Sequence, residues 1–226
     1  MKKIPVRTVG TDRRLLDLLE LAPVGGVPDS NSIKLDGAYP WRDMLGEVVI
    51  RTAPGPGTPT LAAFRGGAVR EYFFAAGDTA DSRFHVPHDH VPGSDLFIHT
   101  HWSHNGTAIA DSLVVTLGIT YSKGHSQGVF QAEIAPVITI AGLSIANTPQ
   151  YAHRIDEIQL SAKEPTATQL DTDLIEPDGI ILINLVATTI PTISGGTQTK
   201  PTILYLDLHY QSTNLGTKNK INNFYT

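Results

Sequence analysis

Glycine and proline are spread along almost the whole chain, and this feature most limits the folds open to it. The 226 residues include 20 glycines and 15 prolines, a density that interrupts long helices. The segments between them are rich in threonine, isoleucine and valine, which fit a half-buried pleated surface. The pattern predicts an all-β protein built from many short strands.

Composition excludes several classes of protein. Charged residues make up only 17% of the chain, below the quarter that is typical of soluble domains, which argues against a coiled coil or a charge-driven disordered chain. The net charge of −5 gives no overall field for nucleic acid or an anionic membrane. There are no cysteines, so disulfides and thiol catalysis are excluded. No apolar run reaches the length of a membrane span. We expect no nucleic-acid or membrane partner.

Alternation of apolar and polar residues marks the strands. In Leu96–Ser103 the histidines lie on the face opposite Trp102, and in Ile203–Tyr210 Asp207 and His209 lie opposite the leucines. Leu113–Tyr121 also alternates, and Asn105-Gly106 ahead of it predicts a hairpin with Leu96–Ser103. Ile180–Thr189 is apolar on both faces, which favours a central position. The order of elements predicts an antiparallel two-sheet β-sandwich or jelly roll.

Turn signals separate these strands. Pro92-Gly93 is typical of a type II turn, and Pro177-Asp178-Gly179 predicts a second turn in which glycine supplies the positive φ. Pro136, within Ala132–Ile140, indicates an edge strand or a bulge.

The first 45 residues are interpreted as an N-terminal arm, and residues 46–226 as the sandwich domain. A leucine-rich stretch, Arg13–Leu21, predicts one short helix that ends before Pro23. So short a helix is marginal alone, so we expect it to dock on a partner. The predicted interface residues are Leu15, Leu16, Leu18 and Leu19.

Six of the nine histidines lie between residues 85 and 104. His99 and His101 are two apart on a strand, so both rings project from one face. If that strand neighbours Ile203–Tyr210, His209 and Asp207 would converge on the same place. His99, His101 and His209 are therefore candidate metal ligands. Because strand histidines more often hydrogen-bond backbone or carboxylates, we predict no bound metal or other cofactor and no catalytic residue.

Two other polar groups are interpreted as structural. His85–His90 is predicted to be a polar loop in which Asp89 or His90 fixes the turn before Pro92. Asp156 and Glu157 point to opposite faces of a strand, so we expect no shared acid pair. Arg154 with Asp156 is interpreted as an ion pair along one face or an interface contact.

Two families share parts of this pattern. Gly93, five residues and then His99-Thr100-His101 resembles the opening of the cupin motif, but Asn105 and Gly106 stand where cupins have a glutamate. In trimeric phage spikes, a His-x-His pair from each of three chains surrounds an ion on the threefold axis, which is a second possible use of these histidines.

A broader resemblance covers roughly residues 40–226. The stretches Phe84-His85-Val86-Pro87-His88, Ile98-His99-Thr100-His101-Trp102 and Asp207-Leu208-His209-Tyr210-Gln211 resemble a module of tailed-bacteriophage virion proteins, most of them uncharacterised. The resemblance implies a virion β-sandwich, with a homotrimer favoured.

We therefore expect a non-enzymatic structural protein located in the virion, either a capsid decoration or cement protein or a part of the neck or tail fibre. Its partners would be copies of itself and major capsid, neck or tail proteins. One alternative is a cupin-like metal-dependent enzyme. The other is a carbohydrate-binding fibre module in which Trp41, Trp102 or loop tyrosines stack on sugars.

Overall fold

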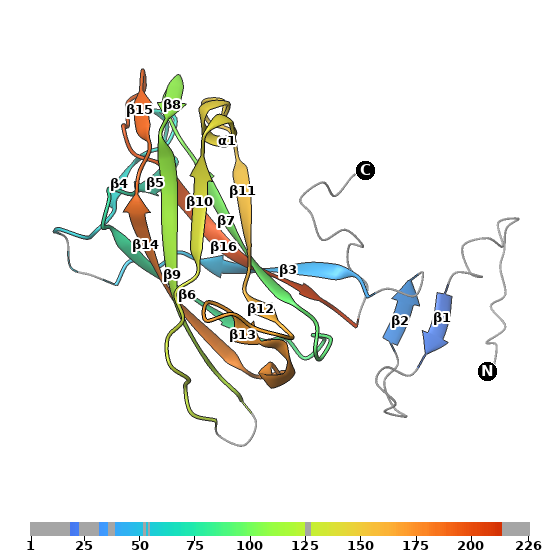
Figure 1. Ribbon diagram of the computed structural model, residues 1–226. Helices are drawn as coiled ribbons and strands as arrows, with labels where there is room; N and C mark the ends of the chain where they lie inside the picture. Colours follow the sequence, from blue (N-terminus) through green and yellow to red (C-terminus); the bar gives the residue numbers. More distant parts are fainter. Residues whose placement is uncertain are drawn as a thin grey trace, which may run out of the picture.

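The computed structural model is a β-sandwich whose two main sheets pack face to face (Figure 1). It describes residues 39–51, 53, 55–124 and 128–213, together with the backbone of two short strands, β1 (Leu19–Ala22) and β2 (Ser32–Leu35). β1 and β2 pair with each other as a separate antiparallel sheet. The expected fold class, an all-β antiparallel sandwich, is confirmed.

One sheet has four antiparallel strands. In spatial order they are β10 (Val137–Ala141), β9 (Ser112–Ser122), β14 (Ile180–Thr189) and β6 (Thr79–His85). The central position predicted for Ile180–Thr189 is confirmed, because β14 lies between β9 and β6. β10 is an edge strand that begins directly after Pro136, as the proline indicated.

The other sheet has six strands. In spatial order they are β11 (Arg154–Gln159), β7 (Leu96–Ser103), β16 (Thr202–Gln211), β5 (Arg70–Phe73) and β4 (Thr60–Ala63), and β3 (Trp41–Glu47) also pairs with β16. β16 is long enough to pair with β5 near its start and with β3 over the rest of its length. β3 thus belongs to the sandwich, and the arm boundary placed at residue 45 falls inside this strand.

Shorter elements close the ends of the sandwich. β8 (Ala108–Ala110) pairs with β15 (Thr192–Ser194), and β12 (Ser161–Ala162) pairs in parallel with β13 (Leu170–Asp171). Helical structure in the described residues is limited to α1 (Leu143–Ala146) and a 3₁₀ turn at Thr172–Leu174. Across those same residues, no helix has both the length and the apolar character needed to cross a membrane.

The core lies between the two sheets and follows the predicted alternation. Trp102 is completely buried in it, as its position opposite the histidines predicted. The four-stranded sheet contributes the apolar face of β9 and β14, and the six-stranded sheet contributes that of β7 and β16. The largest buried side chains include Trp102, Phe84, Leu96, Ile98, Leu113, Leu117 and Ile119.

Three local predictions are wrong. Asn105-Gly106 does not form a hairpin between Leu96–Ser103 and Leu113–Tyr121, because β7 and β9 belong to different sheets. Instead the pair is buried where the chain crosses between the sheets, and the Asn105 side-chain amide donates to the backbone oxygen of Phe64 at 2.6 Å. A side chain with a strong tertiary partner overrides the local turn preference.

The turn after Glu176 also differs from the prediction. Gly179 N–H donates to the Glu176 carbonyl at 3.2 Å, so the turn is present, but Asp178 supplies the positive φ of 64°. Aspartate tolerates this conformation better than most residues. Gly179 is needed for space, because a Cβ there would lie 2.6 Å from the ring of Tyr121.

The last error concerns the N-terminal helix. Leu19, a predicted interface residue at the end of Arg13–Leu21, lies in strand β1, so that part of the helix is wrong. Leu15, Leu16 and Leu18 lie outside the described residues.

Candidate functional site

The face of β7 that points away from the core meets the matching face of β16. The pairing places Asp207 opposite His99 and Tyr205 opposite His101. A bulge at Leu204 precedes this region, so Ile203 packs in the core instead of Leu204. The expected convergence of His99, His101, Asp207 and His209 is confirmed. These four residues form the histidine cluster.

Asp207 lies between the two histidines of β7. Its Oδ1 is 3.0 Å from Nδ1 of His99, and its Oδ2 is 2.6 Å from Nε2 of His101. All three residues are buried, at 5% exposure or less. A carboxylate that is buried in this way is stable only when it is paired or hydrogen-bonded, and the imidazoles provide that pairing.

β3 adds a second carboxylate to the cluster. Asp43 stands opposite His209 in the register of β3 and β16, and its Oδ1 contacts Nδ1 of His209. The same oxygen is 4.0 Å from Nδ1 of His99. The Trp41 ring stacks on the fully buried His209 ring with a centroid distance of 4.9 Å. β3 therefore covers one side of the cluster.

β11 and the loop before it cover the other side. Glu157 Oε2 is 3.1 Å from Nε2 of His99, and Nε2 of the exposed His153 is 2.7 Å from Nδ1 of His101. The Tyr205 ring stacks on His101 at 4.0 Å between centroids. His99 and His101 thus each contact Asp207 through one ring nitrogen. Through the other they contact β11 or the loop before it.

Burial and charge act in opposite directions on these groups. Burial disfavours the charged form of His99, but hydrogen bonding and charge from Asp207, Glu157 and Asp43 outweigh it, so the pKa of His99 is raised. Burial also disfavours the charged form of Asp207 and by itself would raise the pKa of this carboxyl. The hydrogen bonds from His101 and His99 outweigh burial, so the pKa of Asp207 is lowered overall. The pKa of His153 is lowered by burial and by the nearby His101.

Two overlapping sets of donors in the described residues lie close enough to hold a metal ion. One is His99, His101 and Asp207, and the other is Asp43, His99 and His209; within each set the donor atoms all lie within 4.8 Å of one another. The threefold-axis arrangement is not supported, because the His99 and His101 side chains are 3% and 5% exposed and contact carboxylates of their own chain.

Sequence reasoning missed Asp43, Glu157, His153 and Tyr205 as members of this cluster. Alternation does place Asp43 on one face of Trp41–Glu47 with Trp41, so a weak signal existed. It could not show that this strand pairs with residues about 160 positions later.

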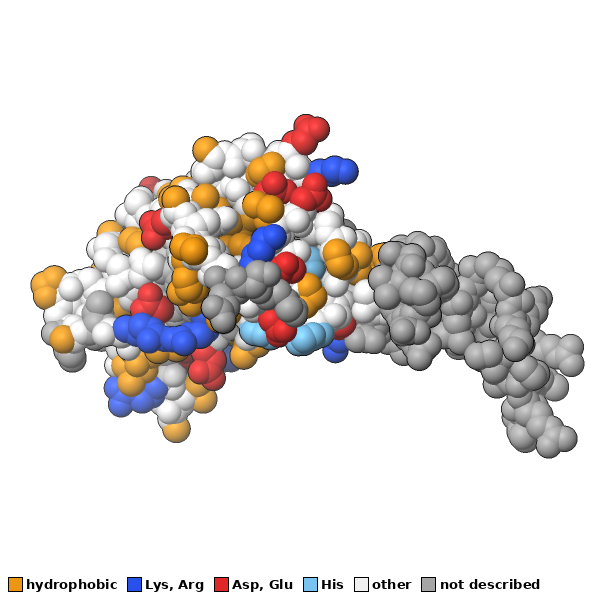
Figure 2. All heavy atoms as spheres, turned by 90° about the horizontal axis from the view of Figure 1, so that it is seen from below, with side chains coloured by type: hydrophobic (Ala, Val, Ile, Leu, Met, Phe, Trp, Pro, Cys, Tyr) orange, Lys and Arg blue, Asp and Glu red, His pale blue; other side chains and the backbone are white. Residues whose placement is uncertain are grey.

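The His85–His90 segment has two separate roles. Exposed His85 and His88 both contact Oδ1 of Asp178, at 3.1 and 2.9 Å. Figure 2 shows that one face of the molecule has histidine and acidic side chains at its surface. Asp89 instead accepts hydrogen bonds from Arg42 and Ser212, both at 2.6 Å. It ties β3 to the end of β16.

His90 is buried behind this contact. Burial lowers the pKa of His90 to about 4, against smaller opposing effects of Ser94 and Asp89. Ser94 N–H donates to the Val91 carbonyl, and Gly93 has a φ of 75°, which confirms the type II turn at Pro92-Gly93.

The predicted ion pair between Arg154 and Asp156 is present, with an N–O distance of 3.2 Å. Asp156 also accepts a 2.7 Å hydrogen bond from the Trp102 indole N–H. Glu157 points to the opposite face, towards His99, so the two adjacent acids do not share a site, as parity predicted.

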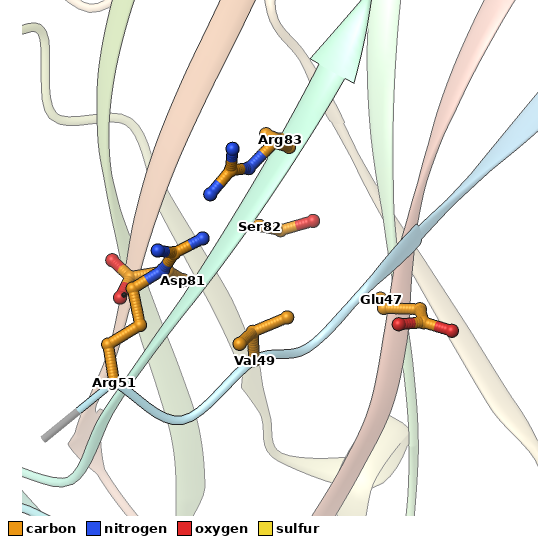
Figure 3. A pocket seen from close by; sticks show the side chains of 6 residues that line it. All are labelled: Glu47, Val49, Arg51, Asp81, Ser82 and Arg83. Carbon is orange, nitrogen blue, oxygen red and sulfur yellow. Dashed lines mark ion pairs between the residues drawn. The ribbon is translucent and has the colours of Figure 1, made fainter.

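A pocket of about 340 Å³ lies between β6 and the end of β3 with the residues that follow it. It is lined by Glu47, Val49, Arg51, Asp81, Ser82 and Arg83 (Figure 3). Arg51 and Arg83 lie on one side of it, and the Glu47 carboxylate lies on the other. Arg51 pairs with Asp81 at 3.4 Å. None of the predicted site residues lines this pocket.

Comparison with known proteins gives similarity of fold alone. No protein-family model and no curated protein matches the sequence. A family 35 carbohydrate-binding module from Clostridium thermocellum is similar over 74% of this chain and 97% of its own, with 13% identity and a TM-score of 0.33. A family 11 module from the same organism, in complex with a mixed-linked tetrasaccharide, is similar over 76% and 90%, with 12% identity and a TM-score of 0.28. These scores are too low for the similarity to bear on function.

Proposed function

We propose that this chain is a non-enzymatic structural protein of a tailed-bacteriophage particle, in which the sandwich is the folded body and the N-terminal segment attaches it to a neighbouring protein. The observation that carries the proposal is the separation of β1 and β2 from the sandwich: they pair only with each other in the described residues, whereas β3 onwards builds one core. The partners proposed are other copies of the chain, with a trimer favoured, and capsid, neck or tail proteins.

The resemblance to virion proteins supports this setting because its residues coincide with the centre of the fold. Ile98–Trp102 lies in β7, and Asp207–Gln211 lies in β16, the two strands that pair at the middle of the six-stranded sheet. A non-enzymatic role agrees with the burial of the histidine cluster: His99, His101 and His209 are at most 4% exposed, which leaves a substrate little access to their rings.

Carbohydrate binding is the second candidate function. Tyr205 is half-buried on the outer face of the six-stranded sheet, and burial together with the charges of Asp207 and Asp43 raises its pKa. An aromatic ring next to hydrogen-bonding carboxylates is a common means of binding sugars. Trp102 is not available for this purpose, since it is fully buried.

A deletion of residues 1–38 tests the leading proposal. All residues of the described core lie after this point, so the shortened chain should keep the β-sheet circular dichroism and cooperative melting of the full chain. It should fail to bind particles that lack the native protein, whereas the full chain binds them.

Retained binding by the folded, shortened chain would refute the role of the N-terminal segment. A glycan array probed with the full chain and with Tyr205→Ala tests the second candidate function. Carbohydrate binding predicts that the full chain binds glycans on the array and that Tyr205→Ala does not.

A further inference from the structure

We propose that His99, His101 and Asp207, together with His209 and Asp43, bind one divalent transition-metal ion, and that zinc is the ion that best fits these ligands. The inference goes beyond the attachment role and does not depend on it. It rests on the positions of donor atoms, on the partners of the opposite ring nitrogens, and on the local charge.

The donor atoms already face one another. Nδ1 of His99 and Nε2 of His101 each contact one oxygen of Asp207, at 3.0 and 2.6 Å. Zinc holds nitrogen and oxygen ligands at about 2.0–2.2 Å, so donors of one ion stand roughly 3–4 Å apart. Small side-chain rotations would therefore open the space that an ion needs between these three residues.

The ring nitrogens that face away from the donors are also partnered. His99 donates Nε2–H to Glu157 Oε2 at 3.1 Å, and Nδ1 of His101 shares a hydrogen bond with Nε2 of His153 at 2.7 Å. With a proton on each of these outer nitrogens, Nδ1 of His99 and Nε2 of His101 can give their lone pairs to a cation, which would replace the protons that face Asp207. Metal-binding histidines almost always have such a second partner.

The local charge also favours a cation. In the described part of the chain, no lysine or arginine forms an ion pair with Asp207 or Asp43. A divalent cation would neutralise the two carboxylates, whose ion-pair partners in the described residues are imidazoles.

The chemistry of the donor set selects the class of ion. Imidazole nitrogens with carboxylate oxygens suit zinc, iron, nickel or copper, whereas calcium and magnesium prefer oxygen ligands alone. The two overlapping sets share His99; each supplies three of the four ligands of a tetrahedral shell, and the other set can add the fourth. The ion would thus join β3, β7 and β16, in the manner of a structural site.

The test is metal binding by the full chain after any affinity tag is removed and the protein is treated with EDTA. Titration with Co²⁺, followed by its visible absorption, and then with Zn²⁺ as competitor should show one saturable site per chain. The double variant His99→Ala plus His101→Ala should lose this site. The matched control, His85→Ala plus His88→Ala, removes two exposed histidines elsewhere and should keep it.

Two milder variants keep the test decisive if the double variant does not fold. Asp43→Asn, at a partly exposed position, removes a proposed ligand and should weaken binding at least as much as the loss of a ligand's partner does, about 10–100-fold. Glu157→Gln acts through His99 and should weaken it about 10–100-fold while shifting the pH at which binding is half lost. Absence of a saturable site in the folded wild type would overturn the proposal, as would equal affinity in wild type, Asp43→Asn and Glu157→Gln.

Discussion

Replacing Asp207 by asparagine measures what the histidine cluster contributes to stability when no metal is bound. Asp207 is 5% exposed, and its two oxygens contact His99 at 3.0 Å and His101 at 2.6 Å. Removing one partner of a buried charge pair costs about 3–5 kcal/mol, because the remaining charge stays buried without compensation. Asparagine keeps the size of the side chain. Any fall in the free energy of unfolding therefore comes from the lost charge and not from a cavity. We expect the free energy of unfolding to fall by about 3 kcal/mol.

The assay is equilibrium urea unfolding at pH 7 in the presence of EDTA, followed by tryptophan fluorescence and by circular dichroism. The urea midpoint should fall while the slope stays constant, since the surface exposed on unfolding is unchanged. Glu164→Gln is the control, because Glu164 is exposed and its substitution should change stability by less than about 0.5 kcal/mol. A loss of less than about 1 kcal/mol for Asp207→Asn would refute the view that this carboxylate is an essential buried partner.

Two further predictions concern His90 and Gly46. The folded pKa of His90 is lowered from 6.5 to about 4, so below pH 6.5 the unfolded chain binds a proton that the folded chain does not. This site should therefore lower the free energy of unfolding by about 3 kcal/mol between pH 6.5 and pH 4, and His90→Asn should remove that part of the slope in urea titrations. Gly46→Ala should cost about 1–3 kcal/mol, because its Cβ would lie 2.4 Å from the Phe84 ring. Gly67→Ala, where nothing lies within 4 Å, should leave the melting temperature almost unchanged; equal effects of the two alanines would contradict the packing argument.

Alternation along single strands predicted correctly which residues share a face. It placed His99 and His101 opposite Trp102 in β7, and Asp207 with His209 in β16, because the side-chain period of a strand is two. Whether these faces meet depends on which strands pair, and alternation does not encode that choice. The same limit explains the wrong hairpin at Asn105-Gly106, where a local turn signal was outweighed by tertiary hydrogen bonds.

Asp43 was missing from the predicted site for a different physical reason. Most of Trp41–Glu47 falls within the predicted arm of residues 1–45, although the whole segment forms an edge strand along β16. An edge strand at the beginning of a chain has few local signals, since its stability comes from a partner far along the sequence. The contact between Asp43 and His209 spans 166 residues, and only the folded structure reveals it.

The burial of β7 shows what the cluster does for the fold itself. All eight residues of this strand are buried, although an antiparallel sheet commonly leaves one face to water. Side chains of neighbouring strands, among them Trp41 and Tyr205, cover its polar face. A slip of one residue between β7 and β16 would turn His99 and His101 into the apolar core and Trp102 out of it, at a cost of several kcal/mol for the unpaired polar groups. The cluster therefore fixes the register of the central strands whether or not an ion is bound, and an ion would add to a specificity that the side chains already provide.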